Sequence, residues 1–351
     1  MMRAPSVGQA GGESRTGGWP SVDALVVSFN SAASLAECLA CLRAQTVPVS
    51  LVCVDNGSVD GSAEIISRLW PQATLLRNAG NLGFAAAVNQ GLALGTAPWV
   101  LLVNPDVVLE PDYVERLLRA GLAARRVGSL TGKLLRAGAL EATPIFDSTG
   151  LFVRADRRAL DRGAGQEDRG QYARDEWVFG VSAAAGLYRR RMLEDVACSG
   201  EVLDEDLFCY REDVDLAWRA KSAGWRAMYV AGAVGRHNRR FRPESREHSQ
   251  EWVRRIGVRN RYLVGVKNET LATFLPSLPA ILARELALVA YCALRERATL
   301  RAIPDAMKLF PRLWRKRRLV RRRAPALRLL RWLLLGTRAA RPVGPKLIGS
   351  S

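Results

Sequence analysis

Residues 97–112 read APWVLLVNPDVVLEPD, in which an apolar run from Trp99 to Val103 leads without a spacer into Asn104 and Asp106. A short continuous apolar run bounded by turn formers is typical of a strand that is buried on both faces of a sheet. In sheets of parallel strands, ligands bind beyond the carboxyl ends of the strands. The sequence therefore predicts that Asn104 and Asp106 lie at a binding site.

A unit of one strand and one helix occurs four times in the first part of the chain. The predicted strands cover residues 22–30, 49–58, 73–78 and 99–103, and the helices that follow them cover residues 34–45, 62–70, 83–95 and 111–126. Ser34 and Glu37 have the spacing of a capping box at the first helix. Alternating strands and helices with short connections indicate an α/β fold with a mostly parallel sheet flanked by helices.

Polar residues follow all four strands. They are Ser28 and Asn30 after the first strand, Asp55, Asn56 and Ser58 after the second, Asn78, Asn81 and Gly83 after the third, and Asn104 and Asp106 after the fourth. Taken singly, such residues are ordinary turn formers and helix caps. Because the carboxyl ends of parallel strands meet at one edge of the sheet, four strands that end this way favour a shared polar site.

The composition is that of a globular protein with a large core. The 351 residues are 48% hydrophobic and 25% charged, which suits one large domain with an appendage. The six cysteines lie in apolar surroundings without a second CxxC pair to complete a zinc site, so we expect buried thiols in a reducing compartment. Residues 1–20 are rich in Gly and Ser and lack an apolar core segment, which indicates a flexible tail instead of a signal peptide. We expect the chain to stay in the cytoplasm.

The net charge of +18 is concentrated at the C-terminus. No Asp or Glu follows Asp305, whereas residues 306–351 hold 14 Lys and Arg, which leaves the first 305 residues with a net charge of +4. Two apolar stretches precede this tail, residues 270–283 and 286–294, and each is shorter than the ~18 residues of a membrane-spanning helix.

The tail alternates Arg with Leu and Trp. Its apolar residues include Leu329, Leu330, Trp332, Leu333 and Leu334. This pattern favours helices that lie in the interface of an anionic membrane. The alternative is a helical pair that packs on the rest of the protein.

Five segments resemble the family 2 glycosyltransferases of GT-A fold, in the order that this family uses. They are VVSFNSAASLAECLACL (26–42), VCVDNGSVDGS (52–62), RNAGNLGFAAAVNQGL (77–92), VLLVNPDVVLEP (100–111) and LDEDLFCYREDVDLAWRAKSAGWRAMYVAGAVGRH (203–237). Together they cover residues 22 to 240, and the branch that they are most similar to is the bacterial rhamnosyltransferase-like group. The resemblance implies transfer of a sugar from a nucleotide-diphosphate donor, UDP- or dTDP-linked, to a lipid-linked glycan acceptor.

The resemblance also implies a divalent cation, Mn²⁺ or Mg²⁺, which would neutralise the diphosphate leaving group. By resemblance, Asp106 and His237 hold this metal. Asn104 stands where the family commonly has the first carboxylate of an Asp-x-Asp motif, and it contributes no charge. His248, inside a charged segment, is interpreted as solvated.

Donor and acceptor residues follow from the same resemblance. Asp55 matches the residue that contacts the nucleobase, and Asn81 and Asn89 fall in the segment that lines the ribose and diphosphate. Ser28, Asn30 and Asn104 complete the expected donor site.

An inverting transferase needs one general base to take the proton from the attacking hydroxyl. By resemblance that base is Asp213, with Glu212 beside it to orient the acceptor. Acidic residues are also common at helix N-termini, so a purely structural role stays open, above all for Asp215. If Asp213 is not the base, Asp215 is the next candidate.

We therefore expect an inverting, metal-dependent glycosyltransferase of cell-envelope polysaccharide synthesis, which moves a sugar, rhamnose being one candidate. The expected parts are a flexible tail (1–20), a GT-A domain (21–240) and a helical, basic region (241–351) that associates peripherally with the cytoplasmic face of the membrane through residues 306–351. A sugar-phosphate nucleotidyltransferase should carry a Gly-rich loop with a basic residue after the first strand, where this chain has SFNSAAS. A catalytically inactive membrane- or nucleic-acid-binding protein is the remaining alternative. Nucleic-acid binding would account for the basic tail but not for acidic clusters at strand ends, so we expect no nucleic-acid partner.

Overall fold

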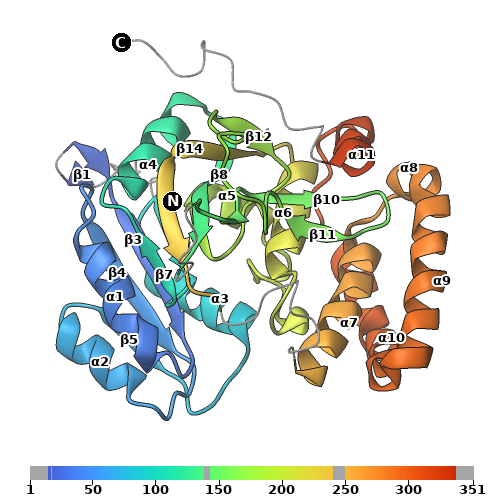
Figure 1. The fold of residues 1–351 in the computed structure, drawn as a ribbon, viewed down its shortest axis with the longest axis horizontal. Helices are drawn as coiled ribbons and strands as arrows, with labels where there is room; N and C mark the ends of the chain where they lie inside the picture. Colours follow the sequence, from blue (N-terminus) through green and yellow to red (C-terminus); the bar gives the residue numbers. More distant parts are fainter. Residues whose placement is uncertain (1–14, 17, 138–142, 240–249, 337–351) are drawn as a thin grey trace, which may run out of the picture.

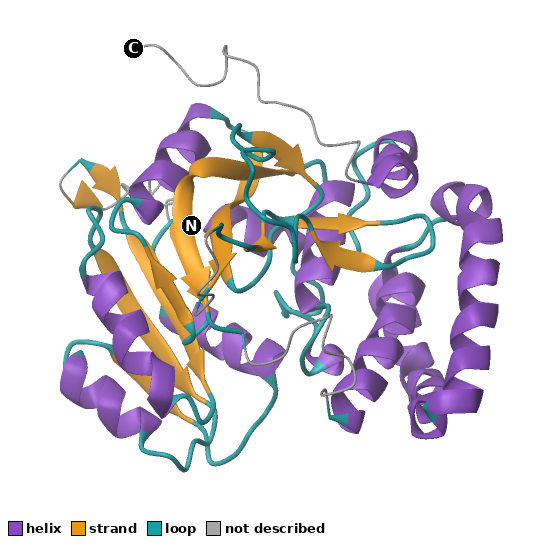
Figure 2. Ribbon diagram, viewed as in Figure 1, coloured by secondary structure: helices purple, strands orange, loops and turns teal. Residues whose placement is uncertain are grey.

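The computed structural model describes residues 15–16, 18–137, 143–239 and 250–336. One ten-stranded sheet forms the centre, with helices against both of its faces, and a group of helices from the C-terminal third stands beside it (Figures 1 and 2). The strand order is β12-β14-β8-β13-β6-β3-β4-β5, with β7 paired to β14 and β9 paired to β8.

The first half of the sheet confirms the predicted alternation of strands and helices. Its elements in chain order are β3 (Val22–Ser28), α1 (Ala32–Arg43), β4 (Val49–Asp55), α2 (Ser62–Leu69), β5 (Thr74–Arg77), α3 (Phe84–Leu94), β6 (Trp99–Val103), β7 (Val107–Leu109) and α4 (Tyr113–Ala123). Strand β3 pairs in parallel with both β4 and β6. The ends of these strands therefore meet at one edge, as the sequence predicted.

The start of α1 differs from the predicted capping box. The helix begins at Ala32, because the backbone amides of Ser34 and Leu35 both donate to the carbonyl of Ser31. The amide of Ala32 is satisfied from a distant loop, by Asp60 Oδ2 at 2.9 Å. Ser34 thus lies inside the first turn and does not cap it, so this prediction was wrong.

The second half of the sheet is mixed, which the regular first half did not reveal. Its elements are β8 (Val127–Arg136), β9 (Phe146–Ser148), β10 (Leu151–Val153), β11 (Ala159–Asp161), β12 (Glu176–Val178), β13 (Ala185–Arg189), α5 (Arg190–Val196), η1 (Glu205–Leu207), α6 (Glu212–Ser222) and β14 (Arg226–His237). Strand β13 runs antiparallel between β6 and β8, and β10 and β11 form a separate hairpin. Strand β14 pairs in parallel with β8 on both sides of a register shift between Tyr229 and Val234, and after the shift it also pairs antiparallel with β7. This course brings His237 opposite Val107, one residue after Asp106.

Two apolar clusters cover the two faces of the sheet. One contains Leu35 and Leu39 of α1 and Leu117 of α4, and the other contains Val88 of α3 and Leu216 of α6. The strands are buried on both faces, in keeping with their continuous apolar sequences. All six cysteines are free thiols; five are buried and Cys209 is partly exposed.

The C-terminal third folds as helices. They are α7 (Glu251–Asn268), α8 (Leu271–Phe274), η3 (Leu275–Ser277), α9 (Leu278–Arg295), η4 (Arg297–Arg301), α10 (Ala302–Arg317) and α11 (Ala326–Leu335). Leu313, Leu329 and Leu333 lie in one buried cluster with Trp218 of α6. Of the two alternatives for the basic tail, its helices α10 and α11 therefore pack on the sheet domain, while residues 337–351 lie outside the described residues.

The two apolar stretches of the sequence join into one helical run. Residues Leu271–Arg295 are helical throughout, long and apolar enough by length and composition to cross a membrane. Pro276 and Pro279 did not break the run, because each occupies the first turn of its helix, where the missing amide costs no helical hydrogen bond.

The N-terminal residues contain one ordered piece. Strands β1 (Arg15–Thr16) and β2 (Trp19–Pro20) pair antiparallel, so the last residues assigned to a flexible tail are structured, and residues 1–14 and 17 lie outside the described part of the chain.

Candidate active site

Asp106 and His237 are far apart in the sequence and meet where β6 and β14 end. His237 Nε2 lies 3.2 Å from Asp106 Oδ1, and the backbone amide of Asn238 donates to the Asp106 carbonyl at 2.9 Å. On the other side of the ring, His237 Nδ1 lies 2.8 Å from Asp147 Oδ2. The imidazole therefore stands between two carboxylates, and Asp147 sets the orientation of the ring toward Asp106.

This arrangement favours a positive charge. Burial by itself lowers the pKa of His237, but the hydrogen bonds and charges of Asp106 and Asp147 outweigh burial and raise the pKa to about 9. The imidazole of His237 is therefore protonated at neutral pH, and one of its protons lies between Nε2 and Asp106. A carboxylate and an imidazole that together attract a cation fit a divalent metal that completes its shell with phosphate oxygens and water. Within the described residues, no group of three or more His, Cys, Asp or Glu side chains forms a closed metal site.

The chain of charged contacts continues past Asp147 toward α6. Arg239 lies 3.2 Å from Asp147 and 3.2 Å from Asp161 of β11. Both Arg239 and Asp161 also act on the charge of Asp213, at the start of α6. The two groups of residues predicted for metal binding and for catalysis are therefore connected through Arg239 and Asp161.

Asp213 has the properties of a proton acceptor near neutral pH. Burial and then the charge of Asp161 raise its pKa to about 6, against the opposing influence of backbone amides and Arg239. Its Oδ1 accepts a hydrogen bond from the Val214 amide at 2.7 Å, and the side chain remains partly exposed. A base with a pKa close to the working pH is the most effective one.

Glu212 is more strongly perturbed than its neighbour. Burial and then the charge of Asp213 raise the pKa of Glu212 to about 8, so this carboxyl is protonated at neutral pH. Its buried Oε2 atom has no protein partner. A neutral carboxylic acid beside the candidate base can donate a hydrogen bond to an acceptor hydroxyl, or accept one from it.

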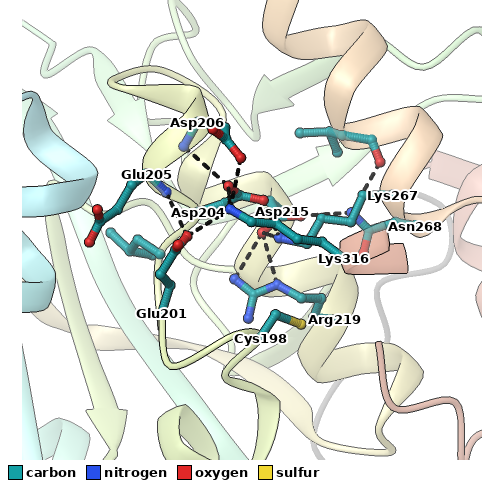
Figure 3. A network of polar contacts seen from close by, with 12 residues as sticks. Cys198, Glu201, Asp204, Glu205, Asp206, Asp215, Arg219, Lys267, Asn268 and Lys316 are labelled. Carbon is teal, nitrogen blue, oxygen red and sulfur yellow. Dashed lines mark hydrogen bonds and ion pairs between the residues drawn. The ribbon is translucent and has the colours of Figure 1, made fainter. Parts of the chain in front are cut away.

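Asp215, the alternative base, has a structural role instead. It is fully buried and contacts Arg219 at 2.8 Å, Lys267 at 2.9 Å and Asn268 at 2.7 Å (Figure 3). Burial alone would raise the pKa of Asp215, but the charges of Arg219 and Lys267 lower it well below its ordinary value. A fully paired carboxylate with a low pKa is a poor general base.

The ends of β3 and β4 offer unsatisfied polar atoms. Ser28 and Asp55 are neighbours in register, both are buried, and neither Ser28 Oγ nor Asp55 Oδ1 has a protein partner. The other oxygen of Asp55 accepts from the Ser58 amide at 3.2 Å, and Asn30 Oδ1 accepts from the Val59 amide at 3.0 Å. Buried polar atoms without partners are unusual unless a ligand or water supplies the missing bond.

The other three predicted donor residues are placed differently. Asn81 Oδ1 accepts from Asn56 and from the Gly83 amide, so it shapes the turn before α3. Asn89 binds the loop before η1, donating to the Leu203 carbonyl at 2.8 Å and accepting from the Leu203 amide at 2.9 Å. Asn104 is held by its backbone, whose amide donates to the Ala184 carbonyl at 2.9 Å, and its side chain is partly exposed beside Asp106.

The segment before Glu212 is strained. Phe208, Tyr210 and Arg211 have φ angles of 64°, 65° and 72°, a region that residues with a side chain rarely adopt. Asn260 of α7 is fully buried and donates through Nδ2 to the carbonyls of Leu207, Cys209 and Tyr210, each at 2.8 Å. A side chain from the C-terminal helices thus holds the loop that presents Glu212 and Asp213.

A buried network of ions makes a second connection between the C-terminal helices and this loop (Figure 3). Lys316 of α10 contacts Asp204 at 2.5 Å, Glu201 at 2.8 Å and Asp206 at 2.8 Å. Lys267 of α7 contacts Asp204 at 2.6 Å. The carboxylates before and within η1 are therefore paired with lysines of helices that follow the sheet domain in the sequence.

Sequence reasoning missed Asp147, Asp161, Arg239 and Asn260. None of these four residues lies in the five segments that carry the family resemblance. The one available signal was FDSTG at 146–150, an Asp enclosed by apolar and small residues. His248 lies outside the described residues.

Known proteins resemble this chain in sequence. Residues 23–197 match the family described as Glycosyl transferase family 2. The chain is 31% identical over 245 residues to N-acetylglucosaminyl-diphospho-decaprenol L-rhamnosyltransferase of Mycobacterium tuberculosis, across 61% of this chain and 75% of that protein. It is 29% identical over 178 residues to the putative glycosyltransferase EpsH of Bacillus subtilis, across 50% of this chain and 48% of that protein.

Solved structures share the fold. Residues 1–349 of S. aureus TarS in complex with UDP-GlcNAc superpose with a TM-score of 0.53 at 16% identity, across 84% of this chain and 82% of that chain. The mannosyltransferase PcManGT from Pyrobaculum calidifontis, in complex with GDP-Man and Mn²⁺, gives a TM-score of 0.50 at 18% identity, across 86% and 85%. Sequence and fold agree with the polar edge formed by β3, β4, β6 and β14, and the chain belongs to glycosyltransferase family 2, as an enzyme of GT-A fold in the rhamnosyltransferase-like branch.

Proposed function

We propose that this enzyme is an inverting, metal-dependent transferase that moves a sugar from a nucleotide-diphosphate donor to a lipid-linked glycan acceptor. The observation that carries the proposal is the pair formed by Asp106 and His237, 3.2 Å apart at the carboxyl end of β6, with Asp147 behind the ring. The mycobacterial relative is named for a rhamnosyl transfer to a diphospho-decaprenol acceptor, which supports rhamnose as the sugar and a polyprenyl-linked acceptor in envelope polysaccharide synthesis.

The donor site is built from the ends of β3, β4 and β6. Ser28 Oγ and Asp55 Oδ1 are buried without partners, and they are suited to hydrogen bonds with a nucleobase. Asn30, Asn81, Asn89 and Asn104 are assigned to the ribose and diphosphate side, although the present contacts of Asn81 and Asn89 are internal ones. UDP and dTDP donors are the candidates.

Asp106 and His237 would hold a divalent cation, Mn²⁺ or Mg²⁺. When bound, this cation would neutralise the negative charge on the diphosphate leaving group. Asp147 accepts the Nδ1 proton of His237 and so keeps Nε2 directed toward Asp106. Asn104 contributes no charge in this position, so Asp106 would be the carboxylate ligand of the cation.

Asp213 takes the proton from the attacking hydroxyl of the acceptor. As the new bond to the anomeric carbon forms, the bond to the diphosphate oxygen breaks and the proton moves to Asp213, which inverts the anomeric configuration. A pKa of about 6 leaves Asp213 ionised at neutral pH and still able to hold the proton. Glu212, with its pKa raised to about 8, donates or accepts a hydrogen bond that orients the acceptor.

The division into a sheet domain (21–240) and a helical region (241–351) is part of the proposal, as is peripheral association with the cytoplasmic face of the membrane. The basic charge of residues 306–351 supports an anionic membrane as a partner. A lipid-linked acceptor would require the enzyme to work at such a surface.

The test is a screen of nucleotide sugars for donor binding and hydrolysis by the full-length enzyme, with calorimetry of UDP and dTDP in the presence and absence of Mn²⁺. The proposal expects nucleotide binding that strengthens with Mn²⁺, and hydrolysis of at least one donor that Asp106→Ala abolishes. Metal-independent turnover that survives Asp106→Ala in chelator would overturn the metal assignment. Pyrophosphate release from a nucleoside triphosphate and a sugar phosphate would favour the nucleotidyltransferase alternative.

A further inference from the structure

Helix α9 has its polarity reversed relative to an ordinary surface helix. Glu285, one of its few charged residues, faces the protein, where it accepts from Arg261 at 2.8 Å and from the Tyr262 hydroxyl at 2.7 Å. The side that faces away from α7 carries Leu282, Leu286 and Leu294, which are 52%, 73% and 81% exposed. A surface helix in water normally turns its charges outward and its leucines inward. On α9 the leucines point outward over several turns, while Glu285 points toward the protein.

The outward side of α9 is continuous. At helical spacing, Leu275, Leu282, Leu286 and Val289 fall on one stripe, and the alanines at 283, 287 and 290 beside them are exposed as well. In the run Leu271–Arg295 only 17% of the most apolar window is buried. Figure 1 shows α9 at the outer edge of the molecule, with α7 on its inner side. An exposed apolar surface of this extent marks an interaction site.

The inner side of α9 is anchored to the protein. Leu288 and Cys292 are buried, and Glu285 is bound to α7. At the start of the run, the Thr270 and Thr273 side chains cap α8, and Thr273 donates to the buried Glu269 at 2.6 Å. Because one side is attached in this way, the helix is placed to dip into a surface with its outer side, and crossing a bilayer would break these contacts.

Helix α10 supplies basic charge next to a second apolar stripe. Ile303, Met307, Phe310 and Trp314 are exposed at helical spacing, and the Phe310 and Trp314 rings stack with centroids 5.6 Å apart. The neighbouring exposed side chains are basic: Lys308, Arg315 and Arg318. No acidic residue follows Asp305 in the chain. Apolar and aromatic side chains bordered by Lys and Arg complement the acyl chains and anionic headgroups of a bilayer.

We propose that the outer side of α9, together with the exposed stripe of α10, is the surface by which this enzyme docks on an anionic lipid bilayer. The inference deepens the proposed function, since it names the surface that would bring the site to a lipid-borne acceptor. It differs from the expectation based on the tail alone, because Leu313, Lys316, Leu329 and Leu333 are buried inside the protein. A second copy of the chain is the less suitable occupant, since the basic residues of α10 would find no acidic counterpart on the same surface.

The test compares two double variants of the full-length chain. Leu282→Glu/Leu286→Glu alters the outer side of α9, and Leu94→Glu/Leu122→Glu is the matched control, with leucines 43% and 48% exposed on α3 and α4. Each protein is floated with vesicles of phosphatidylcholine alone and of phosphatidylcholine with phosphatidylglycerol. We expect the wild type and the control to float with the anionic vesicles, and the α9 variant to partition at least about tenfold more weakly. High salt should release the wild type only in part, because the apolar contribution is insensitive to screening.

Two further measurements keep the inference separate from folding and from catalysis. A fluorophore on Leu286→Cys should shift to shorter wavelength with anionic vesicles, and the same fluorophore on Leu122→Cys should not. Thermal unfolding and donor hydrolysis should be the same in the α9 variant and the wild type, and flotation stands as a result even if no donor is found. Equal flotation of both double variants, or no change in emission at position 286, would overturn the proposal. So would a dimer that forms without lipid and that the α9 variant dissociates.

Discussion

Asp106 and His237 face each other across 3.2 Å, although β6 and β14 are not neighbours in the sheet. After the register shift in β14, its last residues pair with β7 while β8 remains on their other side, and this pairing sets His237 opposite Val107, next to Asp106. A metal site of this enzyme would therefore be assembled by sheet topology and not by a local motif. This placement makes the pair sensitive to changes in the strand as well as in the side chains.

Removal of the Asp106 carboxylate should abolish metal-dependent activity. Asp106→Ala leaves His237 with only Asp147, so we expect loss of turnover and weaker Mn²⁺-dependent nucleotide binding by calorimetry. Asn104→Asp adds a carboxylate beside Asp106 and should be tolerated, with tighter Mn²⁺ binding. Unchanged Mn²⁺ binding by Asn104→Asp would show that residue 104 does not reach the metal.

Metal affinity should rise with pH. The pKa of His237 is raised to about 9, so a cation must displace a proton at neutral pH. We expect the logarithm of the Mn²⁺ association constant to increase by about one per pH unit between pH 6.5 and 8.5, measured by calorimetry with the nucleotide present. Asp147→Asn removes one of the carboxylates that raise this pKa and should flatten the slope. An affinity independent of pH in the wild type would exclude His237 as a ligand.

The acid limb of the pH–rate profile should reflect the ionisation of Asp213. The base must be ionised, so kcat/KM should rise with pH through about 6 and level off above it. Asp213→Asn should retain donor binding and lose about 10² to 10⁴ in transfer.

Two neighbours of Asp213 separate the causes of its raised pKa. Asp161→Asn removes a negative charge near Asp213 and frees Arg239 from its ion pair with Asp161. Both changes lower the pKa of Asp213, so the acid limb of the pH–rate profile should move to lower pH. Glu212→Gln should leave the limb near 6, because Glu212 is neutral in this range. If the acid limb of the pH–rate profile is unchanged in Asp161→Asn, a group other than Asp213 is responsible for it.

The loop before α6 should depend on Asn260. Asn260→Ala removes three hydrogen bonds to the Leu207, Cys209 and Tyr210 carbonyls, so the left-handed residues between them lose their support. We expect a fall in kcat for transfer with little change in donor affinity, because the donor residues lie on other strands. Gly257→Ala on the same helix, where an added methyl group meets nothing, is the control and should be neutral. If Asn260→Ala lowers the amount of folded protein but leaves kcat per folded molecule unchanged, Asn260 has a structural role only.

Lys316 should stabilise the whole protein. Lys316→Ala removes this cation from the buried Asp204 and from the partly buried Glu201 and Asp206, and breaking a buried ion pair typically costs about 3–5 kcal/mol. Arg315→Ala, at the exposed position next to it, should change the free energy of unfolding by less than about 0.5 kcal/mol. Denaturant titration measures both. The same contacts imply that deletion of residues 306–351 unfolds the enzyme, contrary to the behaviour of a detachable membrane tail.

The sequence predicted the first half of the fold well, because its signals are local. A continuous apolar run followed by helical spacing identifies β3 to α4 within a few residues. The capping box at Ser34 failed since the helix start is fixed by Asp60, from a loop that spacing does not reveal. The single helical run was missed because residues 270–283 and 286–294 were counted as separate apolar stretches on either side of Arg284 and Glu285, whereas the helix continues through both charged residues.

The candidate site divides in the same way. Residues directly after strands, such as Asp55 and Asp106, could be proposed from the pattern, and Asp213 and His237 from the resemblance. Asp147, Arg239 and Asn260 could not, because each acts through a partner that is distant in the sequence. Only the folded chain shows which polar side chains are shared between segments.

The strained turn at Phe208, Tyr210 and Arg211 also sets an order of events during synthesis. The turn and the carboxylates beside it depend on residues that come later in the chain: Asn260 donates to the Tyr210 carbonyl, and both Lys267 and Lys316 contact Asp204. A chain that ends before α7 would lack Asn260, Lys267 and Lys316 together, so we expect it to leave the turn before Glu212 unsupported and the fold incomplete. Translation that stops early should therefore yield fragments for proteolysis instead of a smaller working enzyme.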